Sequence, residues 1–334
     1  MRRCWVLCSV LATACGGGAG PDTAATAEEE KQRNLFLISD GPHPGGEWKP
    51  TTISVYGAGM GETLLSQEGG SPNWTPDGHI LFSSTRSGSQ QIWIMDADGS
   101  HARQIGELPS TLLPVMPQMA KNGLIAFMGA DANSVVQPDT NVGIWTVQSD
   151  GSNLKEITTG MQPFLALSGD WIAYTFQTED PYHRQIWRIN TDGTNQRQLT
   201  FLGDPDYPDA NAPSISPDES KIAIFSGKES DKLGGPMQSV FTFGHRNVAV
   251  IPATGGVRRT LTPCKPVTTQ EELDATTECI AADNPAWTPD SQWLIFDVGF
   301  KDAGQTWLVD KEGHNFQRFY DRSRGTVRVA LKWQ

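Results

Sequence analysis

Residues 74–100, WTPDGHILFSSTRSGSQQIWIMDADGS, contain the structural unit from which this chain is built. Pro76 presets φ for a tight turn and Asp77 caps that turn, so the pair predicts a hairpin between the apolar residues on either side. Asp98-Gly99 follows an alternating run around Trp93 and predicts a second hairpin. We name the four expected strands a, b, c and d in chain order.

The unit recurs along the chain, which is typical of a repeat protein. The c–d hairpin is repeated at residues 53–61, 92–99, 144–151, 186–193, 248–255 and 306–313. The a–b hairpin, weaker copies included, is repeated at residues 74–78, 121–123, 168–170, 216–218 and 287–290. Six c–d hairpins against five a–b hairpins leave one unit without an a–b pair.

The two ends of the chain supply the missing strands. Residues 34–39 have the pattern of a b strand, and residues 327–333 that of an a strand, with Trp333 in the position of Trp74. Pairing these strands removes an open sheet edge. We therefore expect an all-β fold, a six-bladed β-propeller of four-stranded antiparallel blades, closed by the C-terminal strand (327–333) in the blade of the N-terminal strands (34–66).

The Pro-Asp-Gly turns and the pattern Trp-x-x-Asp-x-Asp-Gly-Ser, which ends at Ser100, resemble the WD40-like (PD40) repeat of the TolB-type β-propeller family. The resemblance covers residues 33–334, which we expect to form one propeller domain. It implies the fold but no function, because the same repeat occurs in transport scaffolds, peptidase propellers and sugar-acid lyases. TolB has an α/β domain before its propeller, whereas we expect only a tether here.

The N-terminal residues have the features of an export signal. Two arginines precede an apolar run that is too short to span a bilayer, and the run ends at Cys15 in a sequence resembling a bacterial lipobox. We expect a signal peptide (1–15) and a flexible tether (16–32). The chain is then exported to the bacterial periplasm or cell surface and lipid-anchored through Cys15. An ordinary secretory signal cleaved near Ala14 is the alternative.

Cys264 and Cys279 are the cysteines that remain outside the signal. In an oxidising compartment, a disulfide closing a loop of about 15 residues contributes about 3 kcal/mol. We expect these two cysteines to form a disulfide. A zinc site is the alternative, but no His lies between or beside them.

Composition limits the classes of partner. The formal net charge of −12 repels a phosphate backbone, so we exclude nucleic acid. Trp recurs at equivalent positions of strands a and c, and we expect packing between blades rather than sugar binding. These residues are Trp74, Trp93, Trp145, Trp187, Trp287, Trp307 and Trp333.

In a propeller the b–c and d–a connections emerge on one face, which we call the loop face. The a–b and c–d turns form the opposite turn face. The longest connections of this chain are all of the first kind, at residues 40–51, 129–142, 202–212, 227–245 and 262–284. Long loops on a rigid scaffold commonly carry binding residues, so we expect any site on the loop face.

One group of polar residues is predicted to converge there. His183-Arg184 and His245-Arg246 occupy the same repeat position in adjacent blades, so they point to one region of the loop face. The other candidates are His43, Asp204, Asp206 and Asp209. Imidazoles and carboxylates in such a group suit a divalent cation, and the two arginines suit an acidic ligand. Hydrogen bonding at a blade junction is the alternative role.

The sequence thus supports two functions. We favour a non-enzymatic, monomeric envelope scaffold that binds a protein, peptide or glycan and needs no cofactor. The alternative is a metal-dependent lyase or hydrolase acting on acidic oligosaccharides, since the His and Asp candidates resemble the metal site of oligogalacturonate lyases. No catalytic residue is assigned.

Overall fold

The computed structural model describes residues 35–40, 52–57, 61–131, 142–177, 183–201, 209–227, 246–262, 264, 281–299 and 304–321. The predicted signal peptide and tether (residues 1–32) and the predicted closing strand (residues 327–333) lie outside these residues. Within the described residues, no helix is long and apolar enough to cross a membrane.

The described strands form six consecutive antiparallel groups, five of them four-stranded, which we call sheets I to VI; the last two are joined in one larger sheet. Sheet I contains β1 (Leu35–Asp40), β2 (Thr52–Gly57) and β3 (Gly61–Ser66). Sheet II contains β4 (Gly70–Trp74), β5 (Ile80–Ser84), β6 (Gln91–Met95) and β7 (Arg103–Gln104). Sheet III contains β8 (Leu112–Met119), β9 (Leu124–Asp131), β10 (Val142–Gln148) and β11 (Lys155–Thr159).

Sheet IV contains β12 (Met161–Leu165), β13 (Trp171–Gln177), β14 (Arg184–Asn190) and β15 (Arg197–Gln198). Sheet V contains β16 (Asp209–Ile215), β17 (Lys221–Gly227), β18 (Arg246–Pro252) and β19 (Arg259–Thr260). Sheet VI contains β20 (Ala281–Trp287), β21 (Trp293–Gly299), β22 (Gly304–Asp310) and β23 (Gln317–Asp321). A single parallel pair, Arg246 with Ala281, joins sheet V to sheet VI.

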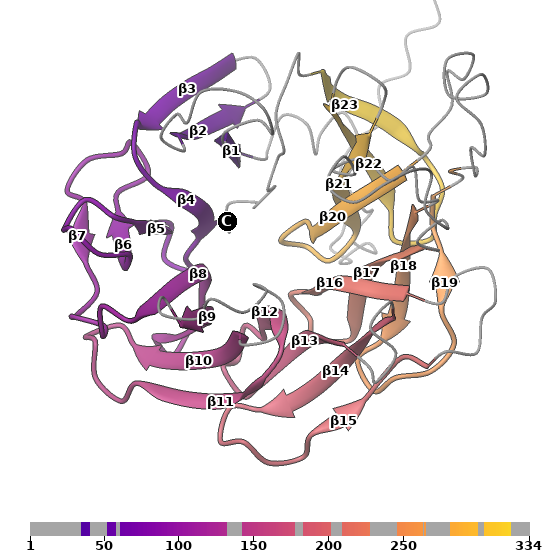
Figure 1. Cartoon of the computed structure of the whole chain (residues 1–334). Coiled ribbons are helices and arrows are strands. Elements are labelled where there is room, and N and C mark those ends of the chain that lie inside the picture. The colour runs from indigo at the N-terminus through magenta and orange to yellow at the C-terminus, as the bar shows by residue number, and fades with distance from the viewer. Residues whose placement is uncertain are drawn as a thin grey trace, which may run out of the picture.

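The sheets are arranged as propeller blades around a common centre (Figure 1). The first strand of each four-stranded sheet lies nearest the centre and the fourth lies at the rim. The predicted hairpins are confirmed: β4–β5 is an a–b pair, β6–β7 is a c–d pair, and β1 begins one residue later than expected. The described residues thus establish a propeller with five four-stranded blades, and a sixth complete blade depends on residues outside them.

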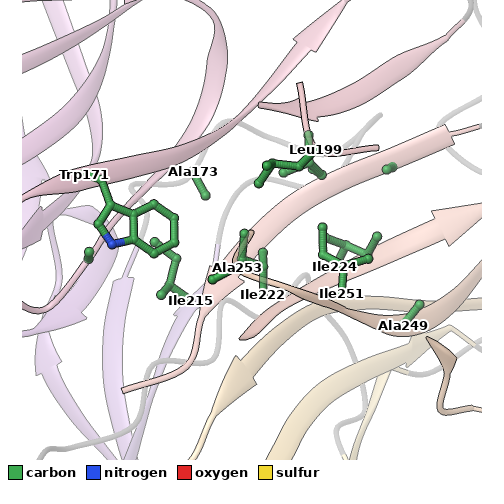
Figure 2. Packing of buried hydrophobic residues seen from close by; sticks show 12 residues of the cluster. Trp171, Ala173, Leu199, Ile215, Ile222, Ile224, Ala249, Ile251 and Ala253 are labelled. Atoms are coloured by element: carbon green, nitrogen blue, oxygen red, sulfur yellow. The ribbon is translucent and has the colours of Figure 1, made fainter. Parts of the chain in front are cut away.

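Hydrophobic clusters fill the junctions between neighbouring sheets. At the junction of sheets IV and V, Trp171, Ala173 and Leu199 of sheet IV meet the apolar residues of sheet V (Figure 2). Trp74 and Trp287 are buried in such clusters, and Trp93, Trp145, Trp187 and Trp307 pack against them in part. The described Trp residues of the repeat therefore pack inside the protein as expected.

The innermost strands share a feature that the sequence analysis did not predict. Each of β4, β8, β12, β16 and β20 contains a bulge whose left-handed residue directly precedes a proline. The pairs are Ser71-Pro72, Met116-Pro117, Gln162-Pro163, Ala212-Pro213 and Asn284-Pro285. A bulge re-aims the backbone, and proline is tolerated where no ladder hydrogen bond is needed. The Pro117 carbonyl accepts a hydrogen bond from Asn73 of the preceding sheet at 3.0 Å.

The a–b turns of sheets II, V and VI contain a Pro-Asp pair, and each is held by the hydroxyl residue that precedes this pair. In sheet V, Ser216 Oγ donates to Asp218 Oδ1 at 2.5 Å and accepts from the Lys221 N–H at 3.0 Å. Thr288 does the same for Asp290 in sheet VI at 2.6 Å. Burial raises the pKa of Asp218, but hydrogen bonds from Ser216 and Ser220 outweigh that effect, so the pKa lies below its ordinary value.

Side-chain hydrogen bonds also connect sheets IV and V at the turn face. Glu219, in the a–b turn of sheet V, accepts from the Ser168 N–H at 2.7 Å and from Trp171 Nε1 at 2.9 Å in sheet IV. The Arg188 guanidinium lies 3.8 Å from the centre of the Trp171 ring and donates to the Ala253 carbonyl at 3.2 Å. This end of the junction is therefore fixed by both packing and hydrogen bonds.

Candidate functional site

Four of the eight candidate ligand residues lie in the described part of the chain. His183 and Arg184 lie at the loop-face end of β14, Arg246 begins β18, and Asp209 begins β16. The other four, His43, Asp204, Asp206 and His245, lie outside the described residues. The structure therefore tests only part of the predicted convergence.

His183 and Asp209 meet across the junction of sheets IV and V. His183 Nδ1 lies 3.4 Å from Asp209 Oδ1, and the same oxygen accepts the backbone N–H of Arg184 at 3.0 Å. The Asp209 side chain is 11% exposed and that of His183 is 29% exposed. Because its Oδ1 accepts a backbone N–H, Asp209 joins β14 to β16 at this junction.

Arg246 lies at the corresponding end of sheet V. Its Cζ is 5.4 Å from the centre of the Phe225 ring, and its backbone pairs with Gly227 and Ala281. A guanidinium over an aromatic face gains a cation–π contribution. Packing on Phe225 therefore limits the positions that the Arg246 guanidinium can take on the loop face.

Amide side chains that sequence analysis had passed over fix the start of two d–a connections. Asn247 Oδ1 accepts from the Cys264 N–H at 3.0 Å, and Asn247 Nδ2 donates to the Cys264 carbonyl at 3.3 Å. In sheet II, Gln91 holds both backbone groups of Leu108 in the same way, at 2.9 and 3.0 Å. Both amides stand two residues before the strand-c position of Trp93, which is the signal that was available.

The two hydrogen bonds from Asn247 fix the backbone position of Cys264, one of the two cysteines of the predicted disulfide. Cys264 is 5% exposed, with its backbone N–H and carbonyl both held by Asn247. Cys279 lies outside the described residues, so its pairing with Cys264 stays a prediction.

No metal centre is formed by the described side chains alone, among which no group of three or more His, Cys, Asp and Glu is placed to hold an ion. His183 and Asp209 supply two donors at most to such a group. The divalent cation therefore stays a prediction that depends on His43, His245, Asp204 and Asp206.

The turn face of sheet II carries a second imidazole–carboxylate cluster, which was not predicted. His101 Nδ1 lies 2.7 Å from Asp96 Oδ2, and the hydrogen bond and charge of Asp96 raise the pKa of His101. His79 lies between two carboxylates, with Nδ1 3.1 Å from Asp77 and Nε2 3.6 Å from Asp96. The turns at Asp77 and Asp96 belong to different hairpins, so their approach requires the folded sheet.

Each face also carries an exposed hydrophobic side chain. Phe201 is 65% exposed and follows β15, where the d–a connection of sheet IV leaves towards Asp209 on the loop face. Val257 is 88% exposed and lies between β18 and β19 on the turn face. The two residues therefore offer a matched pair for probing the faces.

Comparison with known proteins agrees with the architecture. No protein-family model and no curated protein matches the chain. Solved structures match it over most of its length at low sequence identity. TolB from Acinetobacter baumannii has a TM-score of 0.66 and 17% identity, with 91% of this chain and 68% of that chain covered.

Two further structures have similar scores. A putative TolB from Agrobacterium tumefaciens has a TM-score of 0.59 and 13% identity, with 90% and 98% of the two chains covered. A chain of a Nidogen/Laminin complex has a TM-score of 0.58 and 12% identity, with 89% and 98% covered. At such identities the likeness establishes the fold alone. The chain therefore has the β-propeller fold of the TolB-type structures.

Proposed function

We propose that this chain is a cell-envelope propeller that acts as a binding scaffold and presents its loop face to a protein, peptide or glycan. The observation that carries the proposal is the contrast between its two faces. Short hydrogen-bonded turns such as Thr288–Trp293 form the turn face. The connections at residues 202–208, 228–245 and 265–280 join strands d and a or strands b and c of the described sheets, which is the kind of connection that we assign to the loop face. Variable connections on a fixed scaffold are the usual place for recognition.

The proposed scaffold is a closed six-bladed ring. The edge of β1 away from β2 has no partner strand among the described residues. Residues 327–333 complete sheet I there as its first strand, with Trp333 in the position of Trp74. Closure of this kind leaves no sheet edge for association with other chains.

The proposal includes the route to the envelope. Residues 1–15 direct export, Cys15 carries a lipid, and residues 16–32 tether the monomeric propeller to the membrane. An oxidising compartment outside the cytoplasm allows the disulfide between Cys264 and Cys279. Globomycin, which blocks processing of lipidated precursors, would leave a larger precursor if Cys15 is lipidated, and Cys15→Ser would prevent maturation at this site.

Site-specific photo-crosslinking tests the binding role. A photo-reactive amino acid replaces Phe201 in one variant of the exported protein and Val257 in another, and cells are irradiated. We expect discrete adducts from position 201 that are absent from position 257, because only the former lies on the loop face. Equal adducts at both positions, or adducts at position 257 alone, would contradict a loop-face partner.

The second candidate is a metal-dependent lyase or hydrolase acting on acidic oligosaccharides. The observation that favours it is the approach of His183 to Asp209 at 3.4 Å beside Arg184. Its test is the metal content of the protein purified without chelator, beside a His183→Ala/His245→Ala variant. A stoichiometric divalent metal that is lost in the variant supports the enzyme. Absence of metal from both proteins favours the scaffold.

A further inference from the structure

The c–d turns of the propeller carry an acidic residue at one fixed position, and sheet V departs from this pattern. In sheets II to VI the residue directly before the turn glycine is Asp98, Asp150, Asp192, Thr254 and Glu312. In sheets II, III and IV its carboxylate accepts the N–H of the residue two positions later, at 2.8 or 2.9 Å. The turn of sheet V therefore lacks a negative charge that the other four turns have.

The backbone N–H that this carboxylate would hold is exposed in sheet V. Gly256 is the equivalent of Ser100 and Thr194, and its N–H donates no hydrogen bond to any described residue. Gly255 and Gly256 both have positive φ, at 84° and 132°, and Gly256 is exposed. Neither residue has a side chain, so an oxygen from solution can approach this N–H.

A cation of the preceding sheet accompanies the acidic position. Lys155 of β11 stands opposite Thr146, and its Nζ donates to the Asp192 carbonyl in the turn of sheet IV at 2.9 Å. Hydrogen bonds from Thr194 hold the pKa of Asp192 below its ordinary value, and the charge of Lys155 lowers it further. The strand register makes Arg197 of β15 the equivalent of Lys155. The junction of sheets IV and V therefore keeps the cation and lacks the carboxylate.

Sheet IV adds a second arginine to the same place. Arg188 stands opposite Arg197 in the β14–β15 register. Residues directly opposite on antiparallel strands project from one face, with Cβ atoms about 4.5–5.5 Å apart, and like charges there repel. Burial lowers the pKa of the Arg188 guanidinium, and the charge of Arg197 lowers it further. In sheets II, III, V and VI the residue equivalent to Arg188 is uncharged, namely Ile94, Thr146, Val250 and Leu308.

Neither guanidinium is neutralised by contact within the described part of the chain. Arg188 and Arg197 form no ion pair with any carboxylate there. The charge of Glu219 raises the pKa of Arg188 from a distance. The carboxylate of Glu219 is instead bonded to the Ser168 N–H at 2.7 Å and to Trp171 Nε1 at 2.9 Å. The two arginines therefore leave a local excess of positive charge on the turn face.

Arg188 is held in place and still has donors to offer. Its guanidinium lies 3.8 Å from the centre of the Trp171 ring, and Nη1 donates to the Ala253 carbonyl at 3.2 Å. Figure 2 shows Trp171 and Ala253 on the two sheets that meet in this cluster. A guanidinium has five N–H donors, so Arg188 can bind a ligand without giving up these contacts. Arg197 is exposed and can approach the same ligand.

We propose that Arg188, Arg197 and the N–H of Gly256 form a binding site for a phosphate group on the turn face, where sheets IV and V meet. A phosphate monoester carries about −1.5 to −2 charges at neutral pH and three acceptor oxygens, which match two guanidiniums and one N–H. A carboxylate has one charge and two oxygens, so it matches this set less well. The site lies apart from the loop face and does not depend on the partner proposed above.

The ligand that we expect is a soluble phosphate monoester. The formal net charge of −12 repels an anionic membrane surface over most of the protein. A phosphodiester of a lipid headgroup also carries only one negative charge for two guanidiniums. A small ligand of this kind adds no protein contact to the turn face, so the comparison between Phe201 and Val257 is unaffected.

Equilibrium dialysis with radiolabelled inorganic phosphate tests the site, with the purified protein in a chloride buffer of constant ionic strength. We expect one phosphate per chain, and a Kd raised at least about tenfold by Arg188→Gln and by Arg197→Gln. Arg103→Gln is the matched control, because Arg103 is the equivalent residue of β7 and stands opposite Ile94. It should change the Kd by less than about twofold. No bound phosphate, or equal weakening by Arg103→Gln, would overturn the site.

Returning the carboxylate to sheet V gives an independent result in a variant that should fold. Thr254→Asp introduces the residue found in sheets II, III and IV, whose carboxylate would accept the Gly256 N–H and neutralise Arg197. We expect the Kd for phosphate to rise at least about thirtyfold, and Tm in chloride to rise by roughly 1–3 °C. Thr254→Asn, which has the same shape without the charge, should raise the Kd by less than about tenfold. Unchanged binding in Thr254→Asp, or equal effects of the two variants, would contradict the site.

Competition in the same dialysis identifies the chemistry of the ligand. Glycerol phosphate should displace the labelled phosphate, whereas acetate and a short-chain phosphatidylglycerol below its micelle concentration should each need at least about tenfold more. Acetate that competes as well as phosphate would overturn the assignment to a phosphate group. Equal competition by the phosphatidylglycerol would support the phosphate site and overturn the soluble source of its ligand.

Discussion

The turn face and the loop face of the propeller are built from the same strands but by different means. On the turn face, hydroxyl residues such as Ser216 hold the a–b turns of sheets II, V and VI, and Glu219 bonds to the neighbouring sheet. On the loop face, buried amides such as Asn247 hold the first described residues of a long connection. The comparison teaches that hydrogen bonds within and between short turns stabilise the turn face, whereas on the loop face side chains of the strands hold the start of a connection.

The largest loss of stability is expected where packing and a hydrogen bond coincide. Trp287 is 5% exposed and donates from Nε1 to the Ser214 carbonyl of sheet V at 3.0 Å. Trp287→Ala should lower the free energy of unfolding by about 3–5 kcal/mol, because it opens a cavity between sheets V and VI. Denaturant unfolding measures the loss. A loss below about 1 kcal/mol would show that this junction contributes little.

The next effect concerns the turn face itself. Glu219→Ala removes the acceptor for the Ser168 N–H and for Trp171 Nε1, so we expect a loss of about 1–3 kcal/mol. Glu312→Ala is the matched control, since Glu312 is an exposed residue of another turn on the same face. Thermal unfolding of both variants compares them. Equal effects would mean that Glu219 acts through its charge and not through its contacts.

A smaller effect depends on pH. The pKa of Asp218 lies below its ordinary value, so the stability it contributes is present above the unfolded pKa of about 4 and is lost as pH falls through the folded pKa. Ser216→Ala removes one of the hydrogen bonds that lower this pKa. We expect a loss of about 1 kcal/mol at pH 7 and a smaller loss near pH 2.5. A loss that does not change with pH would assign the effect of Ser216 to its backbone contacts alone.

The smallest effect on stability is expected at the exposed hydrophobic residues. Phe201→Ala and Val257→Ala should each change the free energy of unfolding by less than about 0.5 kcal/mol, because both side chains are largely in solvent. Unfolding in urea measures both variants. A clear loss for Phe201→Ala would mean that this side chain is covered within the protein and is no free part of the loop face.

The hairpins were predictable because their chemistry is local. Pro76-Asp77 and Asp98-Gly99 specify turns within a few residues, and the resulting strands pair as expected. The proline of each innermost strand was visible in the sequence, but Pro ordinarily argues against a strand interior. The structure instead places each proline in a bulge, directly after a left-handed residue, as at Ala212-Pro213. The sequence pattern does not specify this backbone conformation.

The candidate site was less predictable because it joins residues that are far apart in sequence. Asp209 was predicted with Asp204 and Asp206 as a possible metal ligand, and that role stays a prediction; the bond from the Arg184 N–H to its Oδ1 was not predicted. That contact depends on how sheets IV and V pack, which local sequence does not encode. The approach of His79 to Asp96 depends in the same way on the pairing of two hairpins.

The most direct test of the account is to block each face in turn and measure binding of the partner captured by the photo-crosslink at position 201. Phe201→Cys and Val257→Cys variants are each coupled to a bulky polyethylene glycol maleimide, and affinity is measured by biolayer interferometry. The account predicts that the polymer at position 201 abolishes binding and that the polymer at position 257 changes the Kd by less than about twofold, which is about 0.4 kcal/mol. Loss of binding from position 257, with binding retained at position 201, would contradict it.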